Sequence, residues 1–457
     1  MKNTSKKRLP LKSKQKISLK KIVLNTKKKT KKQPIKKKTL NQQKLSIKYK
    51  KYMKHMKGGK FIGVGSFGCV LSPNIKCNKK TDSKKKNLSK LITYRSYDIN
   101  ELEDIYDEIN IGKKIKSIDK DNNYLSPIIS YCVLKHKNKN KRTDIKLNYV
   151  DDEDALNEEI EILLSHKENN VKKCLINVNK YLIIINLILS DSGIDLTTLF
   201  SNNTKYKNEI GILKNNYIFS IKHVLNGLEL LQKHKIVHKD IKLDNLCLSI
   251  NNNLPIIKYI DFGLSNNLKY ISKSLDEIHY SGTPCYSPPD YIILIELKKQ
   301  KFNELINNKY LYFNVIKKLF HSIKSNFSTF TNKGLNKSYL CGNLSTYNIF
   351  SNTSSISSIS LNDKKINYFI NINDIKIIMN FLLNLYQNNE LIDYYFTNKI
   401  GLLSKIDIFS TGLVIFEITK ILEINDILVV NLIKNMLELN SINRYNIDDC
   451  INHILFN

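Results

Sequence analysis

The sequence reads HKDIKLDN over residues 238–245 and DFG over residues 261–263. Two short apolar runs, 246–250 and 256–260, lie between these segments and are separated by the polar residues 251–255. Short apolar runs that flank a polar turn are typical of a β-hairpin. The pattern therefore predicts a hairpin that carries acidic and amide side chains near both of its ends.

An amphipathic helix is predicted to lead into the first of these segments. Its apolar residues recur at spacings of three and four, which places them on one face of a helix that ends near His234. These residues are Ile218, Ile221, Leu225 and Leu228. Earlier in the chain, residues 98–118 fit a second amphipathic helix, and residues 181–189 form an apolar run of buried-strand length.

A glycine-rich segment reads GVGSFGCV over residues 63–70 and lies between two predicted strands. Glycine has no Cβ, so the backbone N–H groups of such a segment can approach phosphate oxygens closely. A glycine-rich hairpin turn without a ligand is the alternative interpretation. A dinucleotide-binding motif needs a helix after its last glycine, whereas Val70 and Leu71 continue a strand.

In this order and spacing, the three segments resemble the protein-kinase superfamily, whose catalytic loop reads HRDxKxxN and whose metal-binding motif reads DFG. The resemblance extends through most of residues 57–457. It implies phosphoryl transfer from ATP with Mg²⁺, or with Mn²⁺ as the alternative, and it makes Asp240 the base and Lys242 the charge stabiliser. It makes Asn245 and Asp261 the metal ligands, because amide and carboxylate oxygens suit Mg²⁺.

Three later segments extend the resemblance. Residues 282–290 read GTPCYSPPD, which is similar to the family's GTPxYxxPE segment with Pro-Pro-Asp in place of Ala-Pro-Glu. Residues 407–412 read DIFSTG and resemble the DxWSxG helix start, with Phe in place of Trp. Arg444 stands where the family places the arginine that pairs with the acidic residue of APE. The resemblance implies a buried ion pair between Arg444 and Asp290, although Asp is one methylene shorter than Glu.

The same resemblance assigns the nucleotide-binding residues. Lys90 stands in the place of the lysine that contacts the α- and β-phosphates, and it is favoured over residues 84–86 because apolar residues follow it. Glu108 is its expected helix partner, with Glu101 and Glu103 as alternatives, because neighbouring apolar positions place its turn against the core. The residues expected to bind the nucleotide are Gly63, Val64, Gly65, Ser66, Phe67, Gly68, Val70, Lys90, Leu189 (the gatekeeper position) and Ser190.

The sequence departs from the family pattern in three places. Lys239 replaces the arginine of HRD with a point charge, which predicts weak control by phosphorylation of the activation loop. Leu88 is larger than the usual alanine above adenine, which predicts a reshaped nucleotide pocket. A long gap separates residues 290 and 407 and indicates an insertion over about 296–400, beside the expected peptide-binding surface. Within it, residues 322–362 are rich in Ser, Asn and Thr and predict a low-complexity surface segment.

The positive charge is concentrated at the N-terminus. The chain has 457 residues and a formal net charge of +33, and residues 1–60 contain 24 Lys and Arg and no Asp or Glu. Like charges at this density resist compaction, so residues 1–56 are predicted to form a disordered tail. The potential of the tail should attract nucleic acid or an acidic partner, and a solubilising or targeting arm is the alternative.

Cysteine usage and hydropathy predict the compartment. None of the eight cysteines lies in a CxxC pair or a zinc-ligand pattern, so they are expected to be reduced and mostly buried. The sequence shows no signal peptide and no apolar run of membrane-spanning length. An intracellular location is therefore expected.

The resemblance implies an α+β fold with a small β-rich lobe over residues 57–189 and a larger helical lobe over 190–457. Lys242, together with Thr283, resembles the serine/threonine branch, which implies a protein substrate with a Ser or Thr acceptor. The Lys-, Asn- and Ile-rich composition resembles kinases of large DNA viruses. The alternative function is a pseudokinase scaffold that binds nucleic acid or acidic partners through its tail. The intact catalytic and metal-binding positions argue against that alternative.

Overall fold

The computed structural model describes residues 60–65, 68–74, 87–94, 99–136, 183–328, 372–397 and 399–457. The chain divides into two compact units, Met1–Lys57 and Gly58–Asn457. The tail predicted at residues 1–56 lies outside the described residues. The second unit contains a sheet region followed by a helical region, which confirms the predicted kinase-like α+β fold.

Five antiparallel strands form the sheet of the N-terminal lobe, in the order β1-β2-β3-β5-β4. The strands are β1 (Lys60–Gly65), β2 (Gly68–Ser72), β3 (Asn87–Tyr94), β4 (Ile128–His136) and β5 (Ile183–Ser190). Strand β5 is the apolar run predicted over residues 181–189, and its middle residues are buried between β3 and β4. A strand with two paired neighbours needs the β-branched, apolar composition that β5 has.

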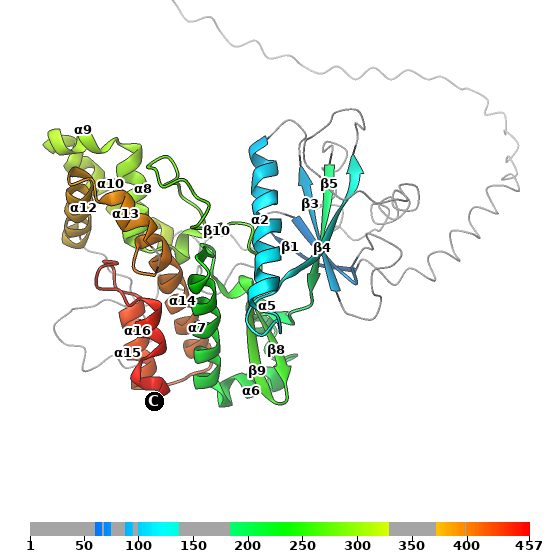
Figure 1. Cartoon of the computed structure of the whole chain (residues 1–457). Helices are drawn as coiled ribbons and strands as arrows, with labels where there is room; N and C mark the ends of the chain where they lie inside the picture. The colour runs from blue at the N-terminus through cyan, green and yellow to red at the C-terminus, as the bar shows by residue number, and fades with distance from the viewer. Residues whose placement is uncertain are drawn as a thin grey trace, which may run out of the picture. The chain divides into compact units, whose positions relative to one another are not determined.

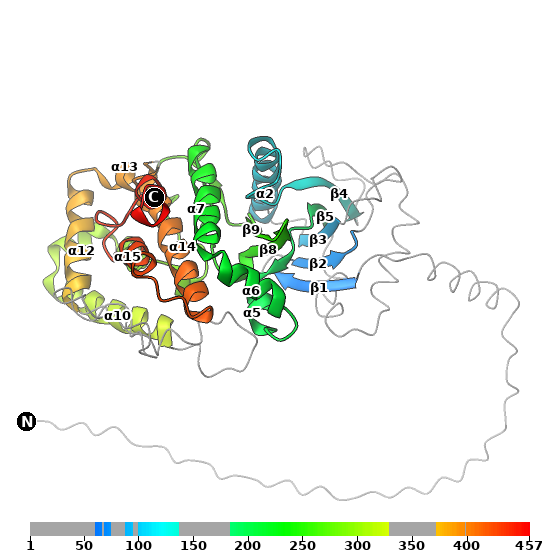
Figure 2. The same ribbon diagram turned by 90° about the horizontal axis from the view of Figure 1, so that it is seen from below.

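Helix α2 (Ile99–Ile118) covers one face of this sheet, as both ribbon views show (Figures 1 and 2). Ile105 and Ile109 lie four residues apart, so both side chains project from the same face of the helix. They pack in one apolar cluster with sheet residues Ile92, Ile128, Ile185 and Leu187. The amphipathic helix predicted over residues 98–118 is therefore confirmed, and burial of its apolar face attaches it to the sheet.

Helix α14 (Leu402–Ile421) is the central helix of the C-terminal lobe. Every residue of α14 from Leu402 to Thr419 is buried, because other helices surround it on all sides. Helices α7 (Tyr217–Lys233) and α15 (Ile427–Met436) pack against it (Figure 2). The other short elements are β6 (Ile194–Asp195), α5 (Leu196–Ser201), α6 (Lys207–Asn215), β7 (Ile236–Val237), β10 (Asn266–Asn267) and α16 (Ile447–Ile451). Among the described residues, no helix is both long enough and apolar enough to cross a membrane.

The hairpin predicted between the two acidic segments is present. Strand β8 (Leu246–Asn251) pairs antiparallel with β9 (Leu254–Tyr259). The two turn residues, Asn252 and Asn253, have φ angles of 48° and 61°. Asparagine tolerates this left-handed conformation, which two-residue hairpin turns of type I′ require at both positions. Helix α7 ends at Lys233, next to the predicted end at His234.

The region between residues 290 and 407 is largely helical where it is described. It contains α8 (Pro289–Lys299), α9 (Phe302–Asn307), α10 (Lys309–Ser328), α12 (Ile372–Gln387) and α13 (Leu391–Phe396). Helix α12 includes residues 375–385, whose apolar residues have helical spacing, whereas α9 and α10 were not predicted. The buried side chains of Val315, Ile316 and Leu319 have the helical spacing that could have revealed α10. Residues 329–362 of the predicted low-complexity segment lie outside the described residues.

The cysteines differ in part from the prediction. Cys247 and Cys450 are free and buried, as expected. Cys69, Cys132 and Cys285 are disulfide-bonded, so the prediction of reduced thiols was wrong for these three. Sequence spacing could not reveal this, because a disulfide joins residues that only the fold brings together.

Candidate active site

The two acidic segments meet beside the β8–β9 hairpin. Ile260 N donates a 3.0 Å hydrogen bond to Asn245 O, so Asp261, the next residue, begins beside Asn245. His238 Nε2 lies 3.0 Å from Ile260 O. Burial lowers the pKa of His238, which keeps the imidazole neutral and leaves one ring N–H to donate to that carbonyl. These contacts fix the loop of residues 238–245 against the segment that begins at Asp261.

Asp240 forms a closed set of hydrogen bonds with Lys242 and Thr283. Lys242 Nζ lies 2.7 Å from Asp240 Oδ2 and 2.9 Å from Thr283 Oγ1. Thr283 Oγ1 donates a 2.6 Å hydrogen bond to Asp240 Oδ1. Asn245 Nδ2 donates to Asp240 O at 2.8 Å and to Asp240 Oδ2 at 2.9 Å. Both carboxylate oxygens of Asp240 are therefore held in one orientation.

The backbone of this loop is anchored by Asp407, in helix α14. The Asp407 carboxylate accepts hydrogen bonds from His238 N at 2.6 Å and from Lys239 N at 2.8 Å. Gly282 packs against the same loop with a φ of 105°, and a Cβ there would lie 2.3 Å from Lys239 O. Only glycine fits this position without strain. Glycine is therefore required at position 282, because the GTPCYSPPD segment approaches the loop closely there.

Lys90, on strand β3, bridges two carboxylates from different parts of the chain. Its Nζ lies 2.7 Å from Glu108 Oε1, on α2, and 2.8 Å from Asp261 Oδ1. Burial by itself would lower the pKa of Lys90, but the charges of Asp261 and Glu108 raise it. Burial would raise the pKa of Asp261, but the charge and hydrogen bond of Lys90 hold it below its ordinary value. Lys90 and Asp261 are therefore held in their charged forms, whereas burial raises the pKa of Glu108 above its ordinary value. Glu108, which the sequence favoured over Glu101 and Glu103, is the helix partner of Lys90.

Four residues near the expected nucleotide site share one face of the sheet. Residues directly opposite each other on antiparallel strands point to the same side, as do residues two apart on one strand. Val70 pairs with Lys90, and Leu88 pairs with Leu189. These four side chains therefore lie on the face that presents Lys90. Leu88 and Leu189 lie opposite each other. Leu88 therefore gives this face more apolar surface than the usual alanine would.

The glycine-rich segment forms the end of the β1–β2 hairpin. Gly65 pairs with Gly68. Ser66 and Phe67, which lie between them in the sequence, are outside the described residues. A Cβ at Gly68 would lie 2.0 Å from Leu91 O, so this glycine is also needed for the packing of β2 on β3. Gly63 and Val64 lie in β1, and Ser190 ends β5 with its carbonyl accepting from Ser126 Oγ at 3.3 Å.

Asn245 and Asp261 have the donor atoms that a magnesium ion requires. The amide nitrogen of Asn245 is committed to Asp240, which directs its oxygen away from that contact. Asp261 uses Oδ1 for Lys90, and its side chain is 22% exposed. Amide and carboxylate oxygens with phosphate oxygens completing the shell are typical of Mg²⁺ sites. No group of three or more His, Cys, Asp and Glu suited to a metal occurs in the described part of the chain, and a site of this type does not need one.

Part of the chain is similar to a known family of protein domains. Residues 129–306 match the model of the protein kinase domain. The chain contains a protein kinase domain. The matched residues include Asp240, Lys242, Asn245 and Asp261, whereas Lys90, Glu108, Asp407 and Arg444 lie outside the match.

Curated relatives of the kinase domain match over a short stretch. Calcium-dependent protein kinase 4 of Plasmodium berghei is 42% identical over 73 residues, which are 16% of this chain and 13% of the relative. Serine/threonine-protein kinase atg1 of Dictyostelium discoideum is 35% identical over 75 residues, which are 16% of this chain and 11% of the relative. The human hormonally up-regulated neu tumor-associated kinase is 36% identical over 72 residues, which are 16% of this chain and 10% of the relative.

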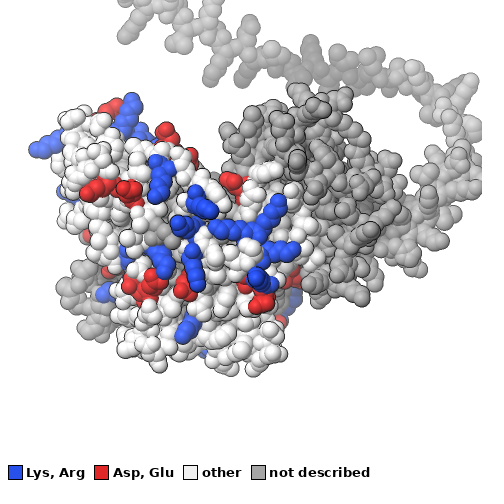
Figure 3. Space-filling model, in the orientation of Figure 1, with Lys and Arg blue, Asp and Glu red and all other residues white. Residues whose placement is uncertain are grey.

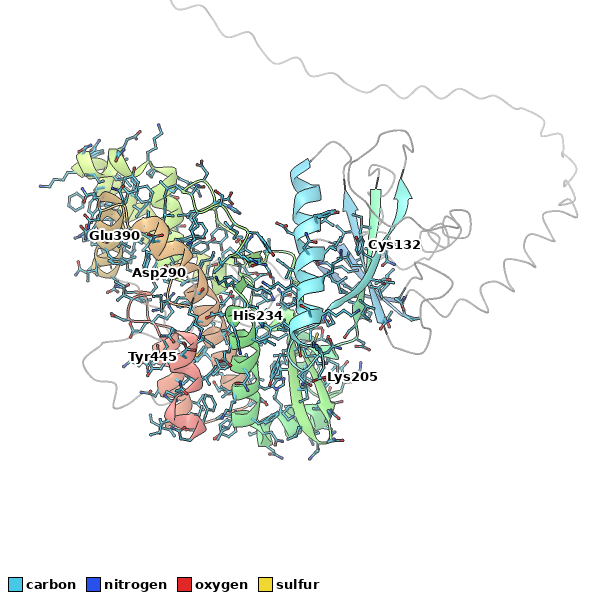
Figure 4. The ribbon with its side chains drawn as sticks, in the orientation of Figure 1. Cys132, Lys205, His234, Asp290, Glu390 and Tyr445 are labelled. Carbon is cyan, nitrogen blue, oxygen red and sulfur yellow. The ribbon has the colours of Figure 1, made fainter. Side chains whose placement is uncertain are left out.

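The ion pair expected between Asp290 and Arg444 is present. Arg444 Nη2 lies 3.1 Å from both carboxylate oxygens of Asp290, and the two side chains are 0% and 3% exposed. One nitrogen makes both contacts, so the shorter Asp does not receive the two-pronged contact that Arg can offer. Asp290 also accepts hydrogen bonds from Ser441 N and Tyr291 N, at 2.9 Å each. These donors compensate the burial of its charge. Figure 4 labels Asp290 where α8 approaches α14.

Two side-chain contacts were not predicted from the sequence. In the sequence, Thr283 was notable only for its resemblance to the serine/threonine branch, but its hydroxyl also orients Asp240. Asp119, at the end of α2, accepts hydrogen bonds from Asn123 N at 3.0 Å and from Tyr124 N and Leu125 N at 2.8 Å each. An Asp followed by a turn-forming Asp-Asn-Asn run was the available signal for the second contact.

Proposed function

We propose that the chain is a serine/threonine protein kinase that transfers the γ-phosphoryl group of ATP to a hydroxyl of a protein substrate. The observation that carries this proposal is the set of hydrogen bonds around Asp240. Its two oxygens face the Lys242 ammonium and the Thr283 hydroxyl. A carboxylate held between a cation and a hydroxyl is suited to orient a second hydroxyl and to accept its proton.

Each residue of the site then has a distinct task. Asp240 orients the acceptor hydroxyl and takes its proton as the new P–O bond forms and the bond to the bridging oxygen breaks. Lys242, 2.7 Å from Asp240, stabilises the negative charge on the transferring group. Lys90, held by Glu108, is placed to contact the α- and β-phosphates. When bound, Mg²⁺ held by Asn245 and Asp261 neutralises phosphate charge.

The contact between Lys242 and Thr283 supports a serine or threonine acceptor. Lys242 Nζ reaches Thr283 Oγ1 at 2.9 Å, across 41 positions of sequence. This contact ties the loop that carries the base to the GTPCYSPPD segment, which resembles a peptide-docking loop. The names of relatives such as serine/threonine-protein kinase atg1 agree with this specificity. We also propose an intracellular location, because ATP is available there. The composition of the chain supports a viral source as part of the same proposal.

Transfer of radiolabelled phosphate from ATP to a mixed protein substrate tests the function. The full chain should label serine and threonine in the substrate, and Asp240→Asn should lower turnover by about 10²- to 10⁴-fold, the range for general-base catalysis. Nucleotide affinity should change little in that variant. Absence of transfer by the wild-type chain with either Mg²⁺ or Mn²⁺ would contradict the proposal.

A scaffold role through the tail is the second candidate function. The observation that favours it is the 24 basic residues within positions 1–60. If about six of these charges meet phosphates of duplex DNA, affinity should fall by roughly 10³ between 50 and 200 mM salt. Binding that is insensitive to salt, or that survives removal of residues 1–50, would exclude the tail as the contact.

A further inference from the structure

A compact group of basic residues lies outside the candidate active site. Lys114 belongs to α2, His234 and Lys235 follow α7, and Lys269 follows β10. We refer to these four residues as the basic cluster. Figure 3 shows Lys and Arg side chains gathered near the middle of this face, and Figure 4 places His234 between α7 and α2. Lys235 and Lys269 are exposed, and Lys114 and His234 are half-buried.

Hydrogen bonds hold the three chain segments of the basic cluster together. Lys114 Nζ donates a 2.6 Å hydrogen bond to His234 O, which ties α2 to the end of α7. Leu268 N donates a 2.8 Å hydrogen bond to Lys235 O, so Lys269 begins beside Lys235. Strand β10 also pairs with β7, the two residues that follow Lys235. The fold therefore holds the backbones of these segments together, and a hydrogen bond also fixes the ammonium group of Lys114.

The basic cluster has no compensating negative charge. In the described residues, none of its four side chains forms an ion pair with a carboxylate. Burial, followed by the charges of Lys269 and Lys235, lowers the pKa of Lys114. Burial, followed by the charges of Lys114 and Lys233, lowers the pKa of His234. Cations that repel one another in this way are stabilised when an anion binds between them.

We propose that the basic cluster binds a single phosphate monoester, as carried by a phosphoserine. A phosphoserine brings about two negative charges and three acceptor oxygens, which matches three lysines from three neighbouring chain segments whose charges act on one another. An extended polyanion would need a longer row of cations than this group provides. Two sources share this chemistry: Ser272 or Ser274 of this chain, which follow Lys269 closely in sequence, and a phosphoserine of another protein.

The proposed site is separate from the position at which the kinase family receives a phosphorylated activation loop. Lys239 stands at that position, is 8% exposed, and its charge acts on His279. No residue of the basic cluster belongs to the set around Asp240. Binding of a phosphoserine is measured without ATP, so its outcome does not depend on whether the chain transfers phosphate.

Fluorescence anisotropy on the full chain tests the site. The probe is a fluorescein-labelled Gly-Ser peptide with one phosphoserine, compared with the same peptide without phosphate at fixed ionic strength. Lys114→Gln, Lys235→Gln and Lys269→Gln should each weaken binding of the phosphorylated peptide by about tenfold, the effect of losing one hydrogen bond to a charged group. The unphosphorylated peptide should bind more weakly and respond little.

Matched controls separate the site from the general positive charge of the chain. Lys205→Gln, Lys207→Gln and Lys214→Gln remove the same charge from exposed positions in and before α6. These variants should bind the phosphorylated peptide with an affinity within about twofold of the wild-type chain, since distant exposed charges are screened. Equal weakening by the cluster and control variants would overturn the proposal. Because Lys269 is exposed, Lys269→Gln keeps the test valid even if Lys114→Gln disturbs folding.

Prior incubation with Mg²⁺ and ATP distinguishes the two sources. If a serine of this chain occupies the site, incubation should abolish peptide binding, and a Ser272→Ala, Ser274→Ala double variant should retain it. This comparison of sources rests on the proposed function. In a chain that incorporates phosphate during the incubation, unchanged binding in both chains assigns the phosphoserine to a partner. A wild-type chain that never discriminates the phosphorylated peptide from the unphosphorylated one would overturn the proposal for both sources.

Discussion

Lys90 Nζ lies 2.7 Å from Glu108 Oε1, with both side chains almost fully buried. This ion pair connects β3 to α2 across the apolar cluster that holds the helix on the sheet. The same ammonium lies 2.8 Å from Asp261 Oδ1, which belongs to the segment after the β8–β9 hairpin. The position of α2 therefore determines how Lys90 is presented to the site.

Replacement of Glu108 should impair the use of ATP. In Glu108→Gln the shape is kept, but Lys90 loses one of its two charged partners and is drawn toward Asp261. We expect kcat/KM for ATP to fall by about 10- to 100-fold, the effect of losing a hydrogen bond between charged groups. Initial-rate kinetics at varied ATP measure this. Glu101→Gln, at one of the alternative positions, is the matched control and should retain wild-type kinetics; a reversed result would assign the pair to Glu101.

Replacement of Thr283 should lower turnover through the orientation of Asp240. Thr283→Val keeps the side-chain shape but removes the hydroxyl that donates to Asp240 Oδ1 at 2.6 Å. We expect kcat to fall by about tenfold or more, with a smaller change in KM for ATP. Thr283→Ser restores the hydroxyl and should recover most of the activity. Equal loss in the Val and Ser variants would show that the methyl group, and not the hydrogen bond, is required.

Replacement of Asp261 should make the reaction dependent on high metal concentration. Asp261→Asn removes the negative charge that contacts Lys90 and that the proposed Mg²⁺ site requires, while Asn245 remains in place. We expect nearly complete loss of transfer at millimolar Mg²⁺ and weaker Mg²⁺-dependent nucleotide binding. Titration of Mg²⁺ and Mn²⁺ in transfer and binding assays checks this. Wild-type activity of the variant at modest Mg²⁺ would remove Asp261 from the metal site.

The hairpin and the residues on either side of it could be predicted because their signals are local. The apolar runs over residues 246–250 and 256–260 each contain the information for one strand, and the Asn pair between them favours the turn. Helix α7 likewise follows from its own apolar spacing. The order of motifs then indicated which residues meet, and Lys90 and Glu108 lie within hydrogen-bonding distance.

Contacts that depend on the three-dimensional path of the chain could not be predicted in the same way. Asp407 reaches the backbone of residues 238 and 239 from another helix, and no local pattern specifies the partners of a buried carboxylate. The disulfide bonding of Cys69, Cys132 and Cys285 has the same origin. Helix α10 is different, because its apolar spacing was visible in the sequence and only the composition of the following segment obscured it.

Loss of the Asp290–Arg444 pair should destabilise the C-terminal lobe strongly. Asp290→Asn leaves Arg444 buried without its counter-charge, and removing one partner of a buried pair costs about 3–5 kcal/mol. The free energy of unfolding in urea measures this effect. Asp448→Asn is the matched control, because it breaks an ion pair with Lys399 whose side chains are 50% and 34% exposed. That variant should lose about 1 kcal/mol or less. If both variants lost the same free energy of unfolding, the buried pair would stabilise the fold no more than the exposed pair does.

The last prediction concerns Asp119, which joins α2 to the segment that precedes Asp261. Its carboxylate accepts three backbone N–H groups of residues 123–125, and this turn pairs with β9. Ser126 N donates to Tyr259 O at 2.9 Å, and Tyr259 N donates to Tyr124 O at 2.9 Å. Asp119 therefore fixes the C-terminal end of α2 relative to a strand that ends two residues before Asp261. Through α2 it also positions Glu108.

Asp119→Asn places an amide donor against backbone donors, so the turn should loosen and kcat/KM for ATP should fall by about tenfold. A double-mutant cycle with Glu108→Gln identifies the route of the effect. If Asp119 acts by positioning Glu108, the double variant should be less impaired than the product of the two single effects, with a coupling of about 0.5–3 kcal/mol. Asp121→Asn, at an exposed position of the same turn, should have no effect. The opposite result is that the two substitutions lower kcat/KM for ATP independently, so that their effects multiply, and that both variants lose the same free energy of unfolding. Asp119 would then support the fold without positioning the active site.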